Sequence, residues 1–377
     1  MSRVKNKKRI ILVTIDPIER NRRVLNQLQT VTRLGWVAEV ITVRAHAGES
    51  AELPEEVRIV RLPLLATSGP LKFMGFNALL KIVLFFRSFD LVFVRGVWPA
   101  FAVLSVHMVK KFDIVYDAHE YFAGLPVLQN RKFVRNLWLW LEKQILKRSK
   151  LAFTVSEPIL ERLYQRYPFF NNWLLIRNLP PYRSPANQNR IERNGLLVVY
   201  HGYFMPERGL ENLLQALAKT GDVSIRLKLV GDGILKEKLH KLVIRLSLEE
   251  RVEFIGMQTE NRLNSILSTC DLGIVLLLPV SENHKFALPN KFFDYIMTGV
   301  PVLASNIPSL QNYIEKYKIG LTVNPDNIDE IARKLDTLAL NKEKLARWQQ
   351  NCFLAAKELC WDKEEIKLRQ AYEKILS

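Results

Sequence analysis

Short apolar runs alternate along this chain with longer stretches in which apolar and polar positions recur at helical spacing. The apolar runs are rich in Val, Ile and Leu, which is typical of strands buried on both faces of a sheet. In the first half the predicted strands are Arg9–Thr14, Ala38–Val43, Leu91–Val94, Asp113–Tyr116 and Leu151–Val155. In the second half they are Leu196–His201, Arg226–Val230, Val252–Ile255, Leu272–Leu278, Pro301–Ala304 and Gly320–Val323.

Helical patterns fill the intervals between these strands, such as Asn21–Leu34, which stops before Gly35. Strands that alternate with helices predict a parallel sheet covered on both faces. The rhythm restarts after Asn178–Gly195, a polar segment with three prolines that is typical of a linker. The sequence therefore predicts an α/β protein of two doubly wound, Rossmann-like domains.

We expect a first domain over residues 1–180 and a second over residues 181–360. The segment 361–377 is predicted to be a packing helix, Trp361–Leu376, that crosses back to the first domain. Ligands of doubly wound folds bind beyond the carboxyl ends of the strands. The active site is thus expected in a cleft between the two domains.

Charge is distributed unevenly between the halves of the chain. The net charge is +17, and residues 1–180 carry 28 Lys and Arg against 14 Asp and Glu, whereas residues 181–377 carry 27 against 24. The first half therefore needs an anionic partner such as nucleic acid, an anionic membrane surface or a phosphorylated substrate.

Composition narrows the class of protein further. A hydrophobic share of 48% with 25% charged residues is typical of a soluble globular protein and excludes disorder and collagen-like repeats. The three cysteines, Cys270, Cys352 and Cys360, are too scattered for a disulfide framework or a zinc cluster and indicate a reducing compartment. The apolar runs are short, so we expect no helix that spans a bilayer.

The stretch 286–302 reads Phe-Ala-Leu-Pro-Asn-Lys-Phe-Phe-Asp-Tyr-Ile-Met-Thr-Gly-Val-Pro-Val. Leu288 and Pro289 interrupt any helix before them. We expect Asn290 to cap a new helix that begins near Lys291. The free N–H groups and the dipole at such a helix start form an anion site, to which Lys291 adds a full charge.

Asp294 lies one turn further along this predicted helix. A carboxylate there can accept hydrogen bonds from both hydroxyls of a ribose. Pyrophosphate at the helix start with ribose one turn along is the arrangement of a bound nucleoside diphosphate. The alternative is an ordinary capped helix whose Asp294 faces solvent.

Seven further motifs follow one another with natural spacing: Val115–Glu120, Thr154–Ser156, Ile176–Asn178, His201–Leu210, Leu229–Gly233, Phe254–Gly256 and Cys270–Asp271. Together with the stretch 286–302, they resemble the large family of retaining, two-domain GT-B glycosyltransferases, family four of the sugar-nucleotide transferases. The resemblance covers most of the chain. It implies that the first domain holds the acceptor and the second the nucleotide sugar.

The chain departs from the family pattern at several positions. Of two glutamates that commonly flank seven residues in the helix region, the second is replaced by Asp294 and the first by Phe286. Tyr203 stands where many members carry Arg. The glycine-rich loop of the family is missing after Thr14.

The resemblance implies the following site residues. Those for nucleotide and phosphate are Gly202, Arg208, Gly231, Gly256, Leu288, Pro289, Asn290, Lys291 and Asp294. The weaker sugar contacts are His284 and Phe286. By itself, Gly231 equally fits a tight turn.

Sugar transfer leaves negative charge on the β-phosphate, and the catalyst must stabilise that charge where it develops. Arg208 offers a planar fork for phosphate oxygens, and Lys291 adds a second cation. His119, just past a predicted strand, is a candidate for contacting the donor sugar or steadying an oxocarbenium-like transition state; the alternative is a loop histidine. Asp117 and Glu120 beside it are not predicted to be catalytic bases.

The pattern Asp-x-Asp and histidine clusters with metal-ligand spacing are missing from the sequence. We therefore expect a metal-independent reaction with no cofactor, in which a UDP- or GDP-sugar is the co-substrate.

Two segments of the first half, 71–87 and 131–148, combine apolar, aromatic and basic residues. Basic helices with Trp and Phe suit the surface of an anionic bilayer, and the alternative is that they pack on the sheet. The candidate membrane or acceptor residues are Arg131, Lys132, Arg135, Trp138, Trp140, Lys147 and Arg148. With the implied acceptor role of this domain, they predict a lipid-linked or phosphorylated glycan acceptor.

The function expected on these grounds is a glycosyltransferase of polysaccharide biosynthesis, lipopolysaccharide or capsule, peripheral on the inner face of the plasma membrane. Two alternatives remain open at this point. One is a basic nucleic-acid- or membrane-binding protein without catalysis, although no nucleic-acid-binding motif is found. The other is a sugar-nucleotide epimerase of the same fold.

Overall fold

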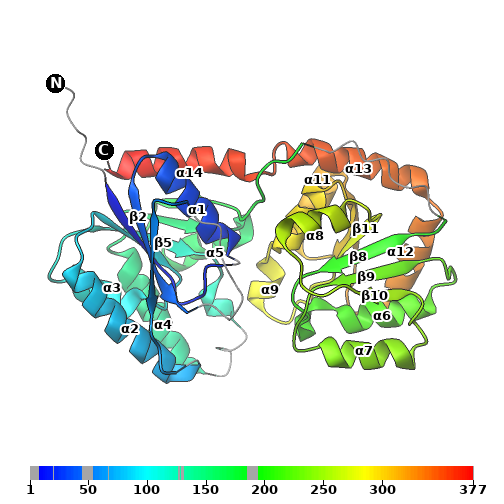
Figure 1. Cartoon of the computed structure of the whole chain (residues 1–377), viewed down its shortest axis with the longest axis horizontal. Helices are drawn as coiled ribbons and strands as arrows, with labels where there is room; N and C mark the ends of the chain where they lie inside the picture. The colour runs from blue at the N-terminus through cyan, green and yellow to red at the C-terminus, as the bar shows by residue number, and fades with distance from the viewer. Residues whose placement is uncertain are drawn as a thin grey trace. The chain divides into compact units, whose positions relative to one another are not determined.

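A computed structural model describes residues 8–19, 21–44, 54–66, 68–125, 128, 131–184 and 194–376 of the chain. The chain divides into two compact units, the first formed by Met1–Asn178 with Lys363–Ser377 and the second by Leu179–Asp362 (Figure 1). In the described ranges each unit is built on a single sheet, and every strand pairing in both sheets is parallel. The predicted fold class, two doubly wound α/β domains, is confirmed.

The sheet of the first unit has the order β3-β2-β1-β4-β5-β6-β7. Its described strands are β1 (Arg9–Val13), β2 (Val37–Val43), β3 (Val57–Leu62), β4 (Leu91–Arg95), β5 (Asp113–Ala118), β6 (Leu151–Thr154) and β7 (Trp173–Leu175). The sequence pattern did not predict β3 and β7. Both are edge strands, and in β3 the exposed Arg58 and Arg61 interrupt the apolar residues Val57, Ile59, Val60 and Leu62, so no continuous apolar run marks it.

Helices cover both faces of this sheet. They are α1 (Arg22–Arg33), α2 (Gly69–Phe86), α3 (Ala100–His107), α4 (Lys132–Leu146), α5 (Glu157–Arg166), the single turn η1 (Phe122–Gly124) and α14 (Trp361–Leu376). Figure 1 shows α2, α3 and α4 together on one face, and α1 with α14 on the other. The predicted start of α1 is confirmed, because the Asn21 side chain accepts a hydrogen bond from the Val24 N–H.

The second unit has a sheet of order β10-β9-β8-β11-β12-β13. Its described strands are β8 (Leu197–His201), β9 (Arg226–Val230), β10 (Val252–Phe254), β11 (Leu272–Val275), β12 (Val302–Ser305) and β13 (Gly320–Val323). Alternate residues of β8 enter two different cores, Val198 and Tyr200 on one face and Leu197 and Val199 on the other. Burial on both faces explains why these strands read as continuous apolar runs.

The helical elements of the second unit lie between and after these strands. They are η3 (Pro206–Arg208), α6 (Leu210–Lys219), α7 (Lys236–Arg245), α8 (Glu260–Leu267), α9 (Glu282–Phe286), α10 (Asn290–Met297), α11 (Pro308–Tyr317), α12 (Ile328–Ala339) and α13 (Lys342–Ala356). The short turns η3, α9 and the start of α10 all follow the carboxyl ends of strands, where a doubly wound fold places its ligand.

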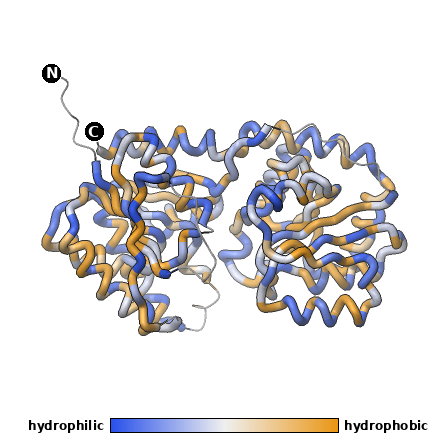
Figure 2. The backbone as a smooth tube through the Cα atoms, viewed as in Figure 1, coloured by the Kyte–Doolittle hydropathy of each residue, from blue (hydrophilic) through white to orange (hydrophobic). Residues whose placement is uncertain are grey.

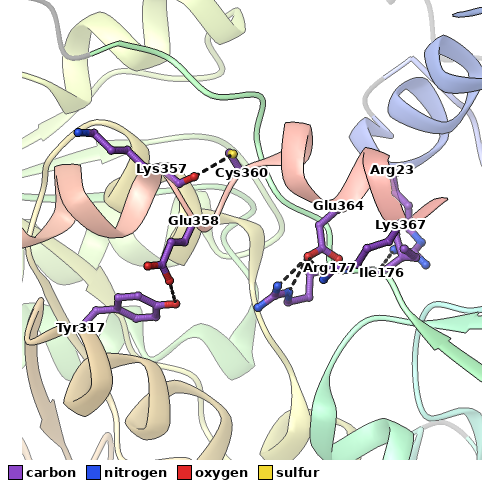
Figure 3. Close-up of polar contacts among 9 residues, drawn as sticks. All are labelled: Arg23, Ile176, Arg177, Tyr317, Lys357, Glu358, Cys360, Glu364 and Lys367. Carbon is purple, nitrogen blue, oxygen red and sulfur yellow. Dashed lines mark hydrogen bonds and ion pairs between the residues drawn. The ribbon is translucent and has the colours of Figure 1, made fainter. Parts of the chain in front are cut away.

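The C-terminal helix α14 begins in the second unit at Trp361 and continues in the first from Lys363. Glu364 is fully buried, accepts hydrogen bonds from the Arg177 guanidinium at 2.7 Å and 3.2 Å, and pairs with Lys367 at 2.8 Å (Figure 3). Tyr372, 1% exposed, packs edge-on against Trp36 and Phe153. Buried charge and apolar packing together hold α14 to the first unit.

Candidate active site

The start of α10 lies beyond the carboxyl ends of β8 and β11. Pro289 occupies the position before the helix, and no side chain caps the first turn. Asn290 is therefore the first helical residue and not the cap, which corrects the sequence prediction. The reason is that Pro289 has the preset backbone angle of a helix entry, so the helix begins one residue earlier than expected. The anion-binding character of the first turn is kept, because its N–H groups have no side-chain cap.

Lys291 in this turn lies beside Tyr200, the penultimate residue of β8. Its Nζ is 3.4 Å from the centre of the Tyr200 ring. Burial, followed by the nearby Arg208 guanidinium, lowers the pKa of Lys291 well below its ordinary value. Within the described part of the chain, neither cation forms an ion pair with a carboxylate. Two cations that repel one another in a partly buried place form a site for an anion.

A small pocket lies at these two cations. It is lined by Tyr200, Arg208, Val275, Leu276, Leu277, Pro289 and Lys291. Val275, Leu276 and Leu277 belong to the end and continuation of β11, and Pro289 and Lys291 to the start of α10. The sequence prediction that Arg208, Pro289 and Lys291 belong to one site agrees with this placement.

The loop that carries Arg208 is held against β11 by a glycine. Gly209 has φ +63°, and a Cβ at that position would lie 2.6 Å from the Leu276 carbonyl oxygen. The Leu278 N–H also donates a hydrogen bond to the Glu207 carbonyl at 3.0 Å. Only glycine permits this approach, which holds Arg208 among the residues that line the pocket.

The loops after β8 and β9 touch through Gly202 and Gly231. A Cβ at Gly231 would lie 2.0 Å from the Gly202 carbonyl oxygen, and one at Gly202 would lie 3.3 Å from Lys291 Nζ. Gly231 therefore serves close packing of two loops, and Gly202 leaves room for Lys291. Gly256 also has a positive φ, +75°, with open space around it.

Asp294 does not face solvent. It is 6% exposed, and its Oδ2 lies 3.5 Å from Nε2 of His201, which is 7% exposed. The His201 backbone N–H donates to the Tyr295 hydroxyl at 3.2 Å, and that hydroxyl donates to the Val199 carbonyl at 3.1 Å. His201 and Asp294 thus form a buried polar pair in the second unit. The predicted ribose contact of Asp294 stays a prediction.

His284 in α9 lies close enough to Arg208 to respond to its charge. Burial, followed by Arg208, lowers the pKa of His284 below its ordinary value. Its Nδ1 lies 2.8 Å from the Ser281 hydroxyl, which orients the ring. Phe286 ends α9 and is half-buried, and Leu288 packs against the core. His284 is therefore a polar candidate near Arg208 for contact with a sugar.

A second polar cluster lies in the first unit, beyond the ends of β1, β4 and β5. Arg95 Nη1 and Asp16 Oδ2 are 2.6 Å apart, and His119 Nε2 and Glu120 Oε1 are 3.9 Å apart. Gly96, with φ +69°, makes room for His119, because a Cβ there would lie 3.1 Å from the imidazole. The pairs Asp16–Arg95 and His119–Glu120 therefore lie together at the carboxyl ends of these strands.

Burial, with Arg95 adding to it, lowers the pKa of His119 to about 3, so the imidazole is neutral near pH 7. Burial also raises the pKa of Glu120 to about 7. Among the described residues, His119 Nδ1 is buried and has no hydrogen-bond partner. A neutral imidazole and a carboxyl group that titrates near neutrality can exchange hydrogen bonds with sugar hydroxyls.

Asp117, the neighbour of this cluster, has a structural role. Its carboxylate accepts hydrogen bonds from Arg23 at 2.5, 2.8 and 3.1 Å, and both side chains are almost fully buried. Burial alone would raise the pKa of Asp117, but Arg23 outweighs that effect and lowers it. Arg23 also donates to the Ile176 carbonyl at 2.5 Å, as Figure 3 shows, and so ties α1 to the end of the first unit.

The predicted membrane residues of α4 divide between its two sides. Arg131, Lys132, Trp140, Lys147 and Arg148 are exposed, whereas Arg135 is partly covered. Trp138 is also partly covered and contacts the rings of Phe73, Trp98 and Phe122. Trp138 is therefore a packing residue, which corrects its assignment as a membrane contact, because it lies on the inward side of α4 with the buried Leu141 and Ile145.

Sequence reasoning missed Asp16 and Arg95. The signal was present, since Arg95 directly follows the predicted strand Leu91–Val94 and strand ends carry ligand contacts. Among the described residues, no group of three or more His, Cys, Asp or Glu side chains is arranged to hold a metal ion.

Two family descriptions match this chain. Glycosyl transferases group 1 matches residues 184–353, and the glycosyl transferase 4-like domain matches residues 21–178. Between them they cover most of the chain. The fold and the site thus define a GT-B glycosyltransferase. The chain belongs to the glycosyl transferases group 1 family, and it is an enzyme, so the non-catalytic and epimerase alternatives are set aside.

Curated relatives carry related descriptions. An uncharacterized glycosyltransferase of Haemophilus influenzae is 29% identical over 67% of this chain and 67% of its own length. The lipopolysaccharide core biosynthesis glycosyltransferase LpsE of Rhizobium meliloti is 26% identical over 40% of this chain and 42% of its own length. An uncharacterized glycosyltransferase of Methanocaldococcus jannaschii is 24% identical over 47% of this chain, and the match spans about half of that relative.

Solved structures of the same fold are more distant in sequence. Sucrose-phosphate synthase of Thermosynechococcus elongatus aligns with a TM-score of 0.81 at 18% identity, over 98% of this chain and 99% of its own. HepE of Anabaena in complex with UDP gives 0.71 at 17%, over 98% and 99%. WaaG, a glycosyltransferase involved in lipopolysaccharide biosynthesis, gives 0.73 at 14%, over 96% and 99%.

Proposed function

We propose that this glycosyltransferase moves a sugar from a UDP- or GDP-sugar to a lipid-linked or phosphorylated glycan acceptor, with retention at the anomeric carbon and without a metal or other cofactor. It works at the inner face of the plasma membrane, in the synthesis of lipopolysaccharide or capsule. Relatives described as lipopolysaccharide glycosyltransferases and a structural neighbour in complex with UDP support this proposal.

The observation that carries the proposal is the cation pair Lys291 and Arg208. Both lie in one small pocket, and the pKa of Lys291 is depressed by burial and then by Arg208. The negative charge of a bound diphosphate would balance these two cations. The uncapped first turn of α10 adds N–H donors at the same place.

The reaction breaks the bond between the anomeric carbon and the oxygen of the β-phosphate. Negative charge grows on that oxygen as the bond breaks. Arg208 and Lys291 stabilise it more in the transition state than in the bound donor, and this difference lowers the barrier. Arg208 binds two oxygens with its fork, and Lys291 acts as a point charge.

The cluster of the first unit serves the sugar and the acceptor. His119, neutral at physiological pH, exchanges hydrogen bonds with sugar hydroxyls. Glu120, with its pKa of about 7, exchanges hydrogen bonds with hydroxyl groups near neutrality. Arg95 is the cation of this cluster, although Asp16 balances it in part.

The acceptor class follows from charge. The first half of the chain carries a net +14 and the exposed cations of α4, so an anionic or membrane-bound acceptor is favoured over a neutral soluble one. Retention is taken from the family that the chain resembles.

Incubation with a panel of sugar nucleotides and bacterial membrane lipids, followed by mass spectrometry, tests the proposal. Release of one nucleoside diphosphate with a lipid product heavier by one sugar supports it. A thermal shift with UDP, GDP and CMP is the companion test, because a ligand at 100 times its Kd stabilises by about 2.7 kcal/mol. Lack of response to every nucleotide, together with no transfer, would overturn the proposal.

A further inference from the structure

Helix α2 exposes an apolar stripe along its whole length. The stripe comprises Leu71, Met74, Ile82, Phe85 and Phe86, with exposed fractions between 49% and 80%. Their spacing places them on one side of the helix, opposite the buried Phe76, Leu80 and Leu84. The helix is long and apolar enough to cross a membrane by length and composition, which departs from the expectation that no such helix exists.

Helix α3 packs beside α2 and extends the same surface. Phe101 is 58% exposed, and Met108 and Val109, just after the helix, are 80% and 68% exposed. Figure 1 shows α2 and α3 side by side on the same face, and Figure 2 shows both as largely hydrophobic. We call the eight exposed residues of these two paragraphs the α2–α3 patch.

Lysines flank the α2–α3 patch along the chain. Neither helix contains Asp or Glu, while Lys72 and Lys81 lie on α2 and Lys111 follows α3; Arg87, directly after α2, pairs with Glu39 at 3.5 Å. Apolar side chains framed by Lys and Arg match an anionic bilayer surface, in which Lys stems lie along the apolar region and their charges reach the headgroups. An interface with another protein surface would gain little from this single sign of charge.

The hydrogen bonds of Asn77 hold α2 to the rest of the first unit. This side chain is 8% exposed, donates to the Trp98 carbonyl at 3.0 Å and accepts from the Ala102 N–H at 3.0 Å. A helix that left the unit to span a membrane would lose both bonds and expose its buried stripe. These contacts favour a helix that lies in the membrane plane.

Lys110 covers the polar end of α2 beside the patch. Its ammonium donates to the carbonyls of Phe85 at 2.9 Å and Arg87 at 2.6 Å. Carbonyls at a helix end are costly to place against lipid unless they are bonded. The carbonyls at the end of α2 that carries Phe85 and Phe86 are therefore hydrogen-bonded, which lowers the cost of placing this end against lipid.

We propose that the α2–α3 patch inserts into the headgroup and acyl boundary of an anionic leaflet, with α2 parallel to the membrane plane. The inference deepens the proposed function, since it names the surface by which the enzyme reaches a lipid-linked acceptor. The cations of α4 add attraction to anionic lipid, whereas the patch adds apolar burial that salt does not screen.

Flotation of the full chain with vesicles of phosphatidylcholine, with and without phosphatidylglycerol, tests the proposal. The variant Met74→Ser/Phe86→Ser should bind anionic vesicles about tenfold more weakly, at high salt as well as low, because exposed apolar area is removed. The matched control Ile234→Ser/Ile244→Ser removes exposed apolar residues of the second unit and should bind like the parent. Equal binding of all three proteins would overturn the proposal.

A second measurement reads insertion directly. In Phe86→Trp, brominated acyl chains should quench the new tryptophan beyond what they quench in the parent, and Ile234→Trp should show no such gain. Bound protein without extra quenching would overturn insertion. Self-association of the parent, lost in Met74→Ser/Phe86→Ser by sedimentation equilibrium without any vesicle binding, would assign the patch to a second copy instead.

Nucleoside-diphosphate binding and donor turnover are measured on the same samples without vesicles. If they persist while the patch fails to bind lipid, only this inference is wrong. If they are missing while the patch binds lipid, the proposed reaction fails and the membrane surface stands.

Discussion

The ammonium of Lys291 lies 3.4 Å from the centre of the Tyr200 ring. An aromatic face stabilises a cation but replaces only part of the water that burial removes. Burial is therefore the largest cause of the lowered pKa of Lys291, with Arg208 second. An anion placed between the two cations would favour the charged form of Lys291 and so offset both effects. The charge of Lys291 and the binding of a diphosphate are therefore thermodynamically linked.

This linkage predicts a pH dependence of nucleotide affinity. Because the pKa of Lys291 is lowered in the free protein and a bound diphosphate raises it, binding takes up a proton between these two pKa values, and affinity falls as pH rises through that interval. Calorimetry of UDP or GDP in buffers of different ionisation enthalpy measures the proton uptake. Lys291→Met should abolish the uptake and weaken binding about tenfold or more, while Lys285→Met, an exposed neighbour, should change neither.

Arg208→Ala should lower turnover more than donor affinity, because its partner charge develops in the transition state. We expect kcat to fall by about 100-fold, in the range known for loss of one charge-stabilising donor, with a smaller change in the donor Kd. Steady-state kinetics together with calorimetry separate the two quantities. Unchanged turnover would show that another cation serves the β-phosphate.

Asp294→Ala should weaken nucleotide binding through the loss of ribose contacts. The side chain is also buried beside His201, so the same change should lower stability. Calorimetric affinity of the folded protein, compared with its thermal midpoint, distinguishes a contact from a fold effect. Affinity equal to that of the parent would exclude the ribose role.

The raised pKa of Glu120 predicts that its contribution to stability depends on pH. Its folded-state pKa is raised to about 7 by burial, so the folded protein holds more protons than the unfolded chain between the ordinary pKa of a glutamate and pH 7. The stability that Glu120 contributes should fall as pH rises across that interval, whereas the lowered pKa of His119 contributes the opposite slope over part of it. The difference in unfolding free energy between the parent and Glu120→Gln, measured by denaturant unfolding, should therefore fall from pH 5 to pH 8. The difference between the parent and Glu161→Gln should stay the same.

The buried pair Arg23 and Asp117 should behave as a structural unit. Arg23→Met or Asp117→Leu leaves one buried charge alone and should cost about 3–5 kcal/mol of unfolding free energy. The double variant should be more stable than either single variant, because no uncompensated charge remains. Additive losses in this double-mutant cycle, measured by denaturant unfolding, would contradict the pairing.

The sequence predicted most strands of both sheets because parallel strands that are buried on both faces form continuous apolar runs. It missed β3, in which Arg58 and Arg61 interrupt the apolar residues, and β7, which is only three residues long. It also identified Lys291 and His119 as candidates, since each follows or faces a strand end, and Arg208 through the resemblance of residues 201–210 to the family motif. The helix start near Asn290 was predicted within one residue, which is as far as local cap preferences can locate it.

The amino-acid sequence by itself determined the alternation of strands and helices, the charge imbalance between the halves and the family. Only the tertiary structure decided that Arg208 and Lys291 share a pocket and that Asp294 is buried against His201. It also decided that Arg23 balances the charge of Asp117 and that Trp138 packs inward. The physical reason is that periodicity and charge are local properties of the chain. A side chain's partner and its burial depend on residues that only tertiary packing brings near it.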